Sequence, residues 1–300
     1  MKDVYVERKD YNKVISIKLV VPCGCNAKCP FCYNKDKPLK QYNRLKFLNN
    51  FIPSLSDLLI KIGDKNPVSL DITGGEPTLD IDLLSSILNE LQRFHIKDKV
   101  QRVTLTTNGT NLSKIPLDLM KDTINYVNIS VHDYVQERRR SIMQIDITGF
   151  EYKQMIERLN SVGITVSATA VIHHTIHNFN KWRDEFIDWA KRLGFIAVRF
   201  RCNVFWNQSH WFDAYMAKTK NEEQFQIIAD EWTTDSHWCR LRRNDGMRVF
   251  FLHGVADTSL LTKGIEYVID DDGKCYCDFD KKNPIDKYEY EIGRIYDRVN

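Results

Sequence analysis

VPCGCNAKCPFCY spans residues 21–33 and follows directly on an apolar run, Val14 to Val21. Three of its cysteines, Cys25, Cys29 and Cys32, have the spacing C-x3-C-x2-C in a stretch containing glycine, proline and asparagine. These residues favour an irregular loop over a helix or strand. Thiolates this close together can bind one side of a compact cluster of soft metal ions, and a single tetrahedral zinc ion is the alternative.

Outward from this loop, period-2 runs rich in Val and Ile alternate with longer segments of helical periodicity. We expect six strands, at Val14–Val21, Val68–Thr73, Val103–Thr107, Tyr126–Val131, Thr165–Ile172 and Ala197–Cys202. We expect helices between them, at Arg44–Ile62, Ile81–Phe94, Leu117–Lys121, Tyr152–Val162 and Lys181–Leu193, the first kinked or split at Pro53. This α/β alternation predicts a parallel sheet with right-handed crossovers, either open and doubly wound or closed as a full or partial barrel.

The alternation stops at about residue 205. An aromatic-rich loop is expected to lead into a helix, followed by short strands at Arg248–Leu252, Glu266–Ile269 and Lys274–Phe279. Asp270 to Gly273 are typical of a hairpin turn between the last two of these strands. We therefore expect a first domain over residues 1–204 and, over residues 205–300, a helix with a small C-terminal β-rich extension.

The overall composition excludes several classes of protein. The chain has 300 residues, and its 43 Lys and Arg against 40 Asp and Glu give a net charge of +3, too small an excess to predict a nucleic-acid partner. No apolar stretch approaches the roughly 18 residues that would span a bilayer. The amino end alternates charges where a signal peptide needs an apolar segment, so we expect a cytoplasmic protein whose thiols are free or metal-bound.

The cysteine loop and the ends of the following strands resemble the radical S-adenosylmethionine (SAM) superfamily. The cysteine spacing, with Phe31 before the last cysteine, is similar to the signature loop of that family. Gly74-Gly75-Glu76-Pro77 ends the second strand and resembles its GGEP segment, and Asn108 lies in a turn similar to its TNG turn. The resemblance covers about residues 14–202 and implies a partial (β/α)6 barrel similar to a TIM barrel.

The resemblance also implies roles for individual residues. Cys25, Cys29 and Cys32 would hold a [4Fe–4S] cluster, and Cys23 is interpreted as a non-ligand because a fourth thiolate would take the position that SAM needs. Paired glycines let a backbone approach a ligand closely, and a carboxylate can pair with the SAM ammonium. The cofactor-binding set is Phe31, Gly74, Gly75, Glu76, Pro77, Asn108, Ser130, for the SAM ribose, and Arg140, for the SAM carboxylate, with Arg138 and Arg139 as alternatives to the last.

Two features outside the SAM motifs carry further hypotheses. Cys239, Cys275 and Cys277 resemble a shortened twitch or SPASM extension and could hold an auxiliary iron–sulfur cluster, with plain β-hairpin cysteines as the alternative. Arg199 and Arg201 are two residues apart on the sixth expected strand and so share one face. Inside a barrel, such cations need either internal carboxylates or a ligand anion.

The function implied by the resemblance is reductive cleavage of SAM to a 5′-deoxyadenosyl radical, which abstracts hydrogen from a small-molecule or peptide substrate. The electron would come from a donor of the flavodoxin or ferredoxin type. Two alternatives are maturation of a ribosomally made peptide and modification of RNA or a nucleoside, and the near-neutral charge does not help the RNA alternative. A non-catalytic metal-binding module is the alternative outside the enzymes.

Overall fold

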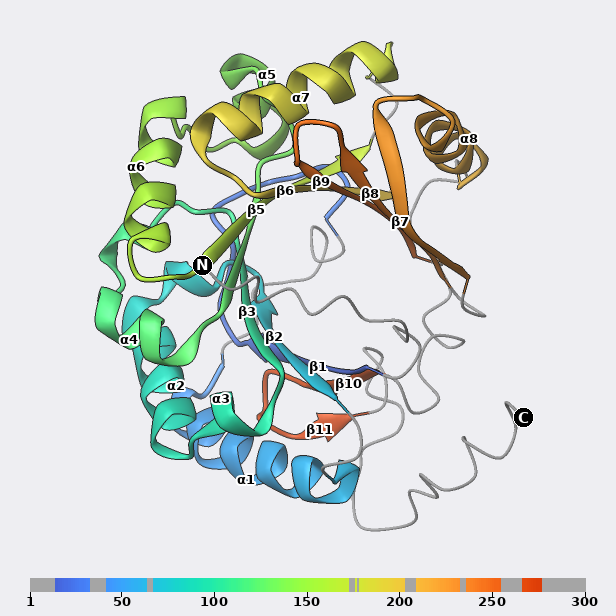
Figure 1. The fold of residues 1–300 in the computed structure, drawn as a ribbon. Helices are drawn as coiled ribbons and strands as arrows, with labels where there is room; N and C mark the ends of the chain where they lie inside the picture. Colours follow the sequence, from blue (N-terminus) through green and yellow to red (C-terminus); the bar gives the residue numbers. More distant parts are fainter. Residues whose placement is uncertain are drawn as a thin grey trace, which may run out of the picture.

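The structure is a computed structural model that describes residues 14–32, 42–63, 67–172, 176, 178–202, 209–232, 236–254 and 266–276. Within these residues, eleven strands form one sheet in the order β11-β10-β1-β2-β3-β4-β5-β6-β9-β8-β7. The sheet curls into an incomplete barrel, and the helices lie on its outer side (Figure 1). The predicted α/β class and partial TIM-like barrel are confirmed.

The strands of the barrel are β1 (Ile15–Val21), β2 (Val68–Gly74), β3 (Arg102–Thr107), β4 (Tyr126–Ser130), β5 (Thr165–Ile172), β6 (Ala197–Cys202) and β9 (Arg248–Gly254). The remaining strands are β7 (Phe225–Trp232), β8 (Ser236–Arg243), β10 (Glu266–Ile269) and β11 (Cys275–Tyr276). The α-helices are α1 (Arg44–Ile62), α2 (Ile81–Arg93), α3 (Ile96–Lys99), α4 (Leu117–Thr123), α5 (Gln136–Met143), α6 (Gly149–Asn160), α7 (Phe179–Leu193) and α8 (Ser209–Lys220). Two short 3-10 helices lie at Pro77–Leu79 (η2) and Leu112–Lys114 (η3).

Alternation along the first barrel strands separates an apolar outer face from a polar inner one. In β1, Ile17 and Leu19 are fully buried under the helices, whereas the side chain of Lys18 between them is 26% exposed. In β2, Leu70 and Ile72 are likewise fully buried, and Asp71 between them faces the other way. We call the side of the strands turned away from the helices the lumen face. The main apolar core therefore lies between sheet and helices, and the lumen side of β1 and β2 is polar.

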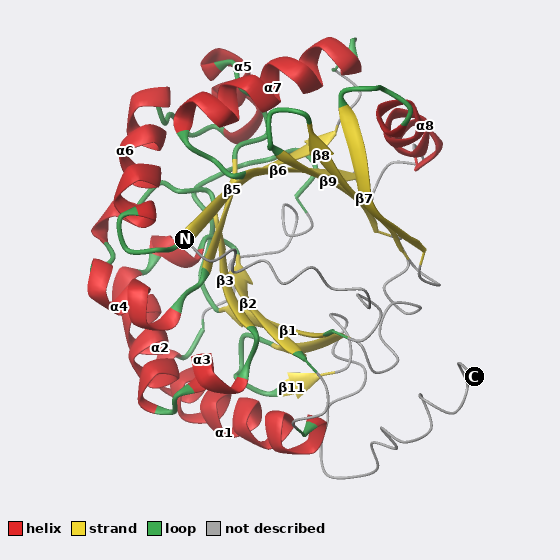
Figure 2. Ribbon diagram, viewed as in Figure 1, coloured by secondary structure: helices red, strands yellow, loops and turns green. Residues whose placement is uncertain are grey.

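The C-terminal segment continues the same sheet at both of its edges (Figure 2). Strand β9 pairs in parallel with β6, and β10 pairs in parallel with β1. Antiparallel partners then extend each edge, β8 and β7 beyond β9 and β11 beyond β10. The strands of the expected β-rich extension thus find partners on the open edges of the barrel, and the division into domains at residue 204 stays a prediction.

Several local features differ from the expectations. Helix α1 runs unbroken through Pro53, whose neighbours Phe51, Ile52 and Leu55 are buried against the core. The structure also contains α3, α5, β7 and β8, which were not predicted from the sequence. The expected turn between β10 and β11 is confirmed: Gly273 has φ +75° and its N–H donates to the carbonyl of Asp270 at 2.7 Å. Among the described residues, no helix is long and apolar enough to cross a membrane.

Candidate functional site

The cysteine loop lies at the carboxyl ends of the parallel strands, where α/β barrels build their binding sites. Its first contact is with the end of β2. The N–H of Glu76 donates to the carbonyl of Gly24 at 2.8 Å, and the Cys23 thiol donates to the carbonyl of Glu76 at 3.1 Å. These two bonds join the loop to the Gly-Gly-Glu-Pro segment.

Glycine is required where these two segments meet. A Cβ atom on Gly75 would lie 2.3 Å from the carbonyl oxygen of Gly24 and 2.6 Å from that of Cys23. Gly74 has φ +146°, and its Cβ would lie 2.5 Å from the carbonyl oxygen of Val21. The close approach expected from the paired glycines is therefore made to the backbone of the cysteine loop itself.

The carboxylate of Glu76 is the centre of a buried hydrogen-bond network. The residue is 1% exposed. Its Oε1 accepts from the N–H of Thr78 at 2.9 Å, from the Thr78 hydroxyl at 2.6 Å and from the Thr107 hydroxyl at 2.5 Å. Its Oε2 accepts from the N–H of Asn108 at 2.6 Å. Four internal donors thus occupy the carboxylate that was expected to pair with the SAM ammonium, and it ties β2 to β3.

Asn108 extends this network into the cysteine loop. Its side-chain amide donates to Oδ1 of Asn26 at 2.8 Å, and its Oδ1 accepts from the N–H and the hydroxyl of Thr110 at 2.9 and 2.6 Å. The amide of Asn26 in turn donates to the Thr110 hydroxyl at 3.2 Å. Asn26 lies between the first two cysteines of the motif. Nothing in the sequence pattern indicated its role, because its partner is 82 positions away.

The far side of the loop is held by β4 and α5. Phe31 is buried, and its ring meets that of His132 edge-on with 4.7 Å between centroids. His132 follows β4 with a positive φ of 65°, and its Nδ1 accepts from the N–H of Val171 at 3.2 Å. The N–H of Lys28 donates to the carbonyl of Met143 at 2.8 Å. The loop is therefore fixed by the ends of β2, β3, β4 and α5.

The three candidate ligands lie close enough to influence one another electrostatically. Burial, followed by the neighbouring Cys32 and Cys25, raises the pKa of the Cys29 thiol to about 12, and burial also raises the pKa of Cys25. Within the part of the chain that the structure describes, no three His, Cys, Asp or Glu side chains converge on a position for a single metal ion. A four-iron cluster takes its thiolates on different irons, so its ligands surround a cube. Three thiolates on one short loop are soft donors of the kind that hold an iron–sulfur cluster.

The remaining residues of the expected SAM set lie on neighbouring elements. Pro77 is buried at the start of η2, and Ser130 is half-buried at the end of β4. Arg139 is buried and donates to the backbone carbonyls of Asp133, Tyr134 and Ile147 at 2.9 to 3.2 Å, which anchors α5. Arg140 lies on the outside of α5, with its side chain 70% exposed and 3.7 Å from Asp146. Contact of any of these residues with SAM stays a prediction.

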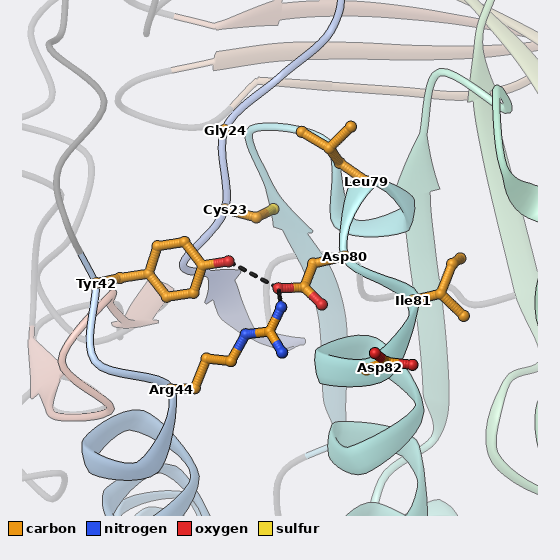
Figure 3. A pocket seen from close by; sticks show the side chains of 8 residues that line it. All are labelled: Cys23, Gly24, Tyr42, Arg44, Leu79, Asp80, Ile81 and Asp82. Carbon is orange, nitrogen blue, oxygen red and sulfur yellow. Dashed lines mark hydrogen bonds and ion pairs between the residues drawn. The ribbon is translucent and has the colours of Figure 1, made fainter.

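A surface cavity of about 380 Å³ adjoins the loop at Cys23 (Figure 3). The Tyr42 hydroxyl donates to Oδ2 of Asp80 at 2.7 Å, and Arg44 forms an ion pair with the same carboxylate. Burial raises the pKa of the Cys23 thiol to about 12. The interpretation of Cys23 as a non-ligand stays a prediction.

The late cysteines do not gather within the described residues. Cys239 is on β8 and Cys275 on β11, which lie towards opposite ends of the sheet order. Cys239 is buried in the core, and burial raises the pKa of its thiol to about 12. Cys277 lies outside the described residues. The described residues thus give the auxiliary cluster no support, and it stays a prediction.

Comparison with known proteins identifies the class of enzyme. The family model of the radical SAM superfamily matches residues 19–190, more than half of the chain. This chain belongs to the radical SAM superfamily, whose members use a [4Fe–4S] cluster and SAM.

Individual relatives and solved structures agree with this. The chain is 26% identical to GTP 3′,8-cyclase of Helicobacter pylori (strain HPAG1) over 232 residues, which cover 74% of this chain and 65% of that protein. It is 24% identical to a probable GTP 3′,8-cyclase of Pyrococcus abyssi over 243 residues, 80% of this chain and 72% of that protein. The match thus spans just under two thirds of the first relative. The structure of Streptococcus suis SuiB bound to SAM has the same fold, with a TM-score of 0.57, 13% identity, and coverage of 92% of this chain and 62% of that one.

Proposed function

We propose that Cys25, Cys29 and Cys32 bind a [4Fe–4S] cluster and that the chain cleaves SAM reductively. A reduced cluster bound there would supply the electron for cleavage of the SAM sulfonium to methionine and a 5′-deoxyadenosyl radical, which would abstract a hydrogen atom from the substrate. The protein has to hold the loop rigid and orient SAM against the cluster. A small organic molecule or a peptide is the substrate class, and a flavodoxin or ferredoxin-type protein is the proposed electron donor.

The observation that carries this proposal is the attachment of the cysteine loop to four structural elements at the carboxyl ends of the strands. Glu76 joins β2 to the turn after β3. Asn108 joins that turn to Asn26 in the loop. A loop that only sequestered metal would not need its backbone packed against Gly75 without room for a Cβ atom. We call the carboxyl ends of the barrel strands the rim. The hydrogen-bond network of Glu76 and Asn108 at this rim favours an enzyme over a non-catalytic metal-binding module.

A nucleotide is a second candidate for the substrate. Two relatives whose matches cover 74% and 80% of this chain carry the name GTP 3′,8-cyclase, the second of them as probable. The identity is low and part of the first relative lies outside the match, so the proposal extends only to chemistry on a purine nucleoside triphosphate. Incubation of reconstituted protein with SAM, dithionite and GTP tests it: consumption of GTP in step with 5′-deoxyadenosine supports a nucleotide substrate, and unchanged GTP rejects it.

The proposed cleavage of SAM is tested with single cysteine variants reconstituted without oxygen. Cys25→Ala, Cys29→Ala and Cys32→Ala should each lose the visible absorption of the cluster and the release of 5′-deoxyadenosine. Cys23→Ser, in the same loop, is the matched control and should keep both, because its thiol bonds to the Glu76 carbonyl. Release of 5′-deoxyadenosine by any of the three alanine variants would reject the ligand assignment.

A further inference from the structure

The lumen face carries a group of charged side chains that the proposed SAM site does not use. Lys18 on β1 forms an ion pair with Asp71 on β2. Arg102 is the first residue of β3, and Arg199 lies on β6. Each alternates with fully buried core residues, Val103 beside Arg102 and Val198 and Phe200 beside Arg199, so both point to the lumen face.

These cations share one carboxylate. Burial alone would raise the pKa of Asp71, but the charges of Lys18, Arg102 and Arg199 together lower it to about 2. Among the described residues, three cations thus act on Asp71, and Lys18 contacts it directly. Buried or half-buried cations in excess favour the binding of an anion from outside the protein.

Unpartnered polar atoms gather at the same place. Among the described residues, four buried side-chain atoms have no hydrogen-bond partner: Nε of Arg102, Oγ1 of Thr104, the hydroxyl of Tyr152 and Nε of Arg199. Three of these four belong to lumen-facing residues of β3 and β6. A buried donor without an acceptor costs about 1–3 kcal/mol, so a cluster of them marks a site that a ligand would complete.

Aromatic rings hold the two arginines in position. The guanidinium carbons of Arg102 and Arg199 lie 5.8 and 5.7 Å from the centre of the Tyr126 ring, and that of Arg199 lies 5.1 Å from the centre of Phe250. Both arginines, with Arg240, line a cavity of about 30 Å³. That is about the space of one water molecule, so a single oxygen atom of a larger group fits it.

We propose that Arg102 and Arg199 form an oxyanion-binding subsite in the barrel that holds a phosphate or carboxylate group of the substrate. The planar guanidinium group, with several donors, suits either oxyanion. The side chains of Lys18 and Trp238 nearby are 26% and 40% exposed, so solvent reaches the lumen face. The assignment to the substrate rests on the proposed function, whereas binding of the anion does not.

The position of the subsite constrains the substrate. Arg199 lies three residues before Cys202, the last residue of β6, which places it about 10 Å below the rim along the strand. The proposed cluster and SAM lie at the rim. The substrate is therefore a molecule with its anionic group at one end and the reacting carbon nearer the rim.

Calorimetric titration of the anaerobically reconstituted protein with inorganic phosphate, and separately with succinate, tests the subsite. We expect saturable binding of at least one of them, and the tighter one identifies the phosphate or the carboxylate class. Arg102→Gln and Arg199→Gln should each weaken it by about tenfold or more, the effect of losing a charge-assisted hydrogen bond. Arg192→Gln, an equal charge change on the exposed end of α7, is the matched control and should bind as the wild type does.

Unfolding curves and cluster absorption of each variant separate lost binding from lost folding, and the two arginine variants provide independent tests. Absence of saturable binding in the wild type, or folded arginine variants that bind as tightly as Arg192→Gln, would overturn the subsite. Anion binding without SAM cleavage would reject the proposed function and leave the subsite standing. SAM cleavage without anion binding would reject the subsite and leave the proposed function standing.

Discussion

At the rim of the barrel the buried carboxylate of Glu76 accepts four hydrogen bonds, whereas on the lumen face the buried Nε–H groups of Arg102 and Arg199 donate to no partner among the described residues. The two regions belong to the same sheet, but the polar groups of the first are satisfied and those of the second are not. A fully satisfied network fixes the position of a loop. An incompletely satisfied one provides binding energy for a ligand. Under the two proposals, the cofactors would bind a rim whose hydrogen bonds are already satisfied, and the substrate would complete those of the lumen face.

Glu76→Ala should have the largest effect, because it leaves four donors at the rim without their acceptor. At about 1 kcal/mol or more for each, the free energy of unfolding should fall by about 4 kcal/mol, measured by urea denaturation. Glu157→Ala is the control, since that side chain is 64% exposed and 3.9 Å from Lys153, and it should cost less than about 0.5 kcal/mol. An equal loss of unfolding free energy in the two variants would show that the network of Glu76 contributes no more to stability than an exposed surface residue.

Gly75→Ala should have the second largest effect on stability, because the new Cβ would lie 2.3 Å from the carbonyl oxygen of Gly24. The cysteine loop has to shift, at a cost of about 3 kcal/mol, and iron content after reconstitution should fall. Gly149→Ala on α6 is a matched control, since its Cβ meets nothing within 4 Å. Normal iron content in Gly75→Ala would show that the loop does not depend on this contact.

Asn108→Ala should have an intermediate effect. It removes the bond to Asn26 and leaves the hydroxyl and N–H of Thr110 without their acceptor, at a cost of about 1–2 kcal/mol. We expect a larger fractional loss of 5′-deoxyadenosine release than of iron, because the loop would keep its cysteines but lose their alignment with the turn after β3. Asn111→Ala is the control, since Asn111 makes no capping bond to η3. An activity equal to that of this control would contradict the role of Asn108.

Asp71→Asn tests the comparison from the lumen side, and its effect on stability should depend on pH. Because the folded protein lowers the pKa of Asp71 to about 2, its contribution is present above the unfolded value near 4 and is lost as pH falls towards 2. The difference in unfolding free energy between wild type and variant should therefore shrink over that pH range. Phosphate or succinate should bind the variant more tightly, and weaker binding would contradict the proposed subsite.

Much of the barrel could be predicted from the sequence because each strand alternates a core residue with a lumen residue. The pattern failed where that alternation is broken. Strand β7 has a register shift between Ile227 and Ala229 that interrupts its period of two. In β8 the lumen-facing Arg240 and Arg242 alternate with the buried Cys239 and Leu241, but the basic run hid the strand. Pairing of β9 and β10 with the barrel edges depends on distant partners, which local patterns do not encode.

The candidate site was predictable only in part, because its contacts also join residues that are distant in the sequence. The motif residues lie at strand ends, and a resemblance was enough to select them. Their contacts were not predictable, because Glu76 bonds to Thr107 and Asn108 to Asn26 across long sequence separations. Arg102 and Arg199 belong to no motif that we recognised, and only the alternation of β6 indicated the face of Arg199. Their significance depends on the absence of a partner, which a sequence does not reveal.

Electron paramagnetic resonance of the reconstituted, dithionite-reduced protein, with and without SAM, tests the central claim most directly. The claim is that the rim holds a [4Fe–4S] cluster on three thiolates with one iron open to SAM. We predict a [4Fe–4S] signal that changes when SAM is added, that persists in Cys23→Ser and that is absent in Cys29→Ala. An iron–sulfur signal indifferent to SAM, or a protein that binds only zinc, would contradict this account.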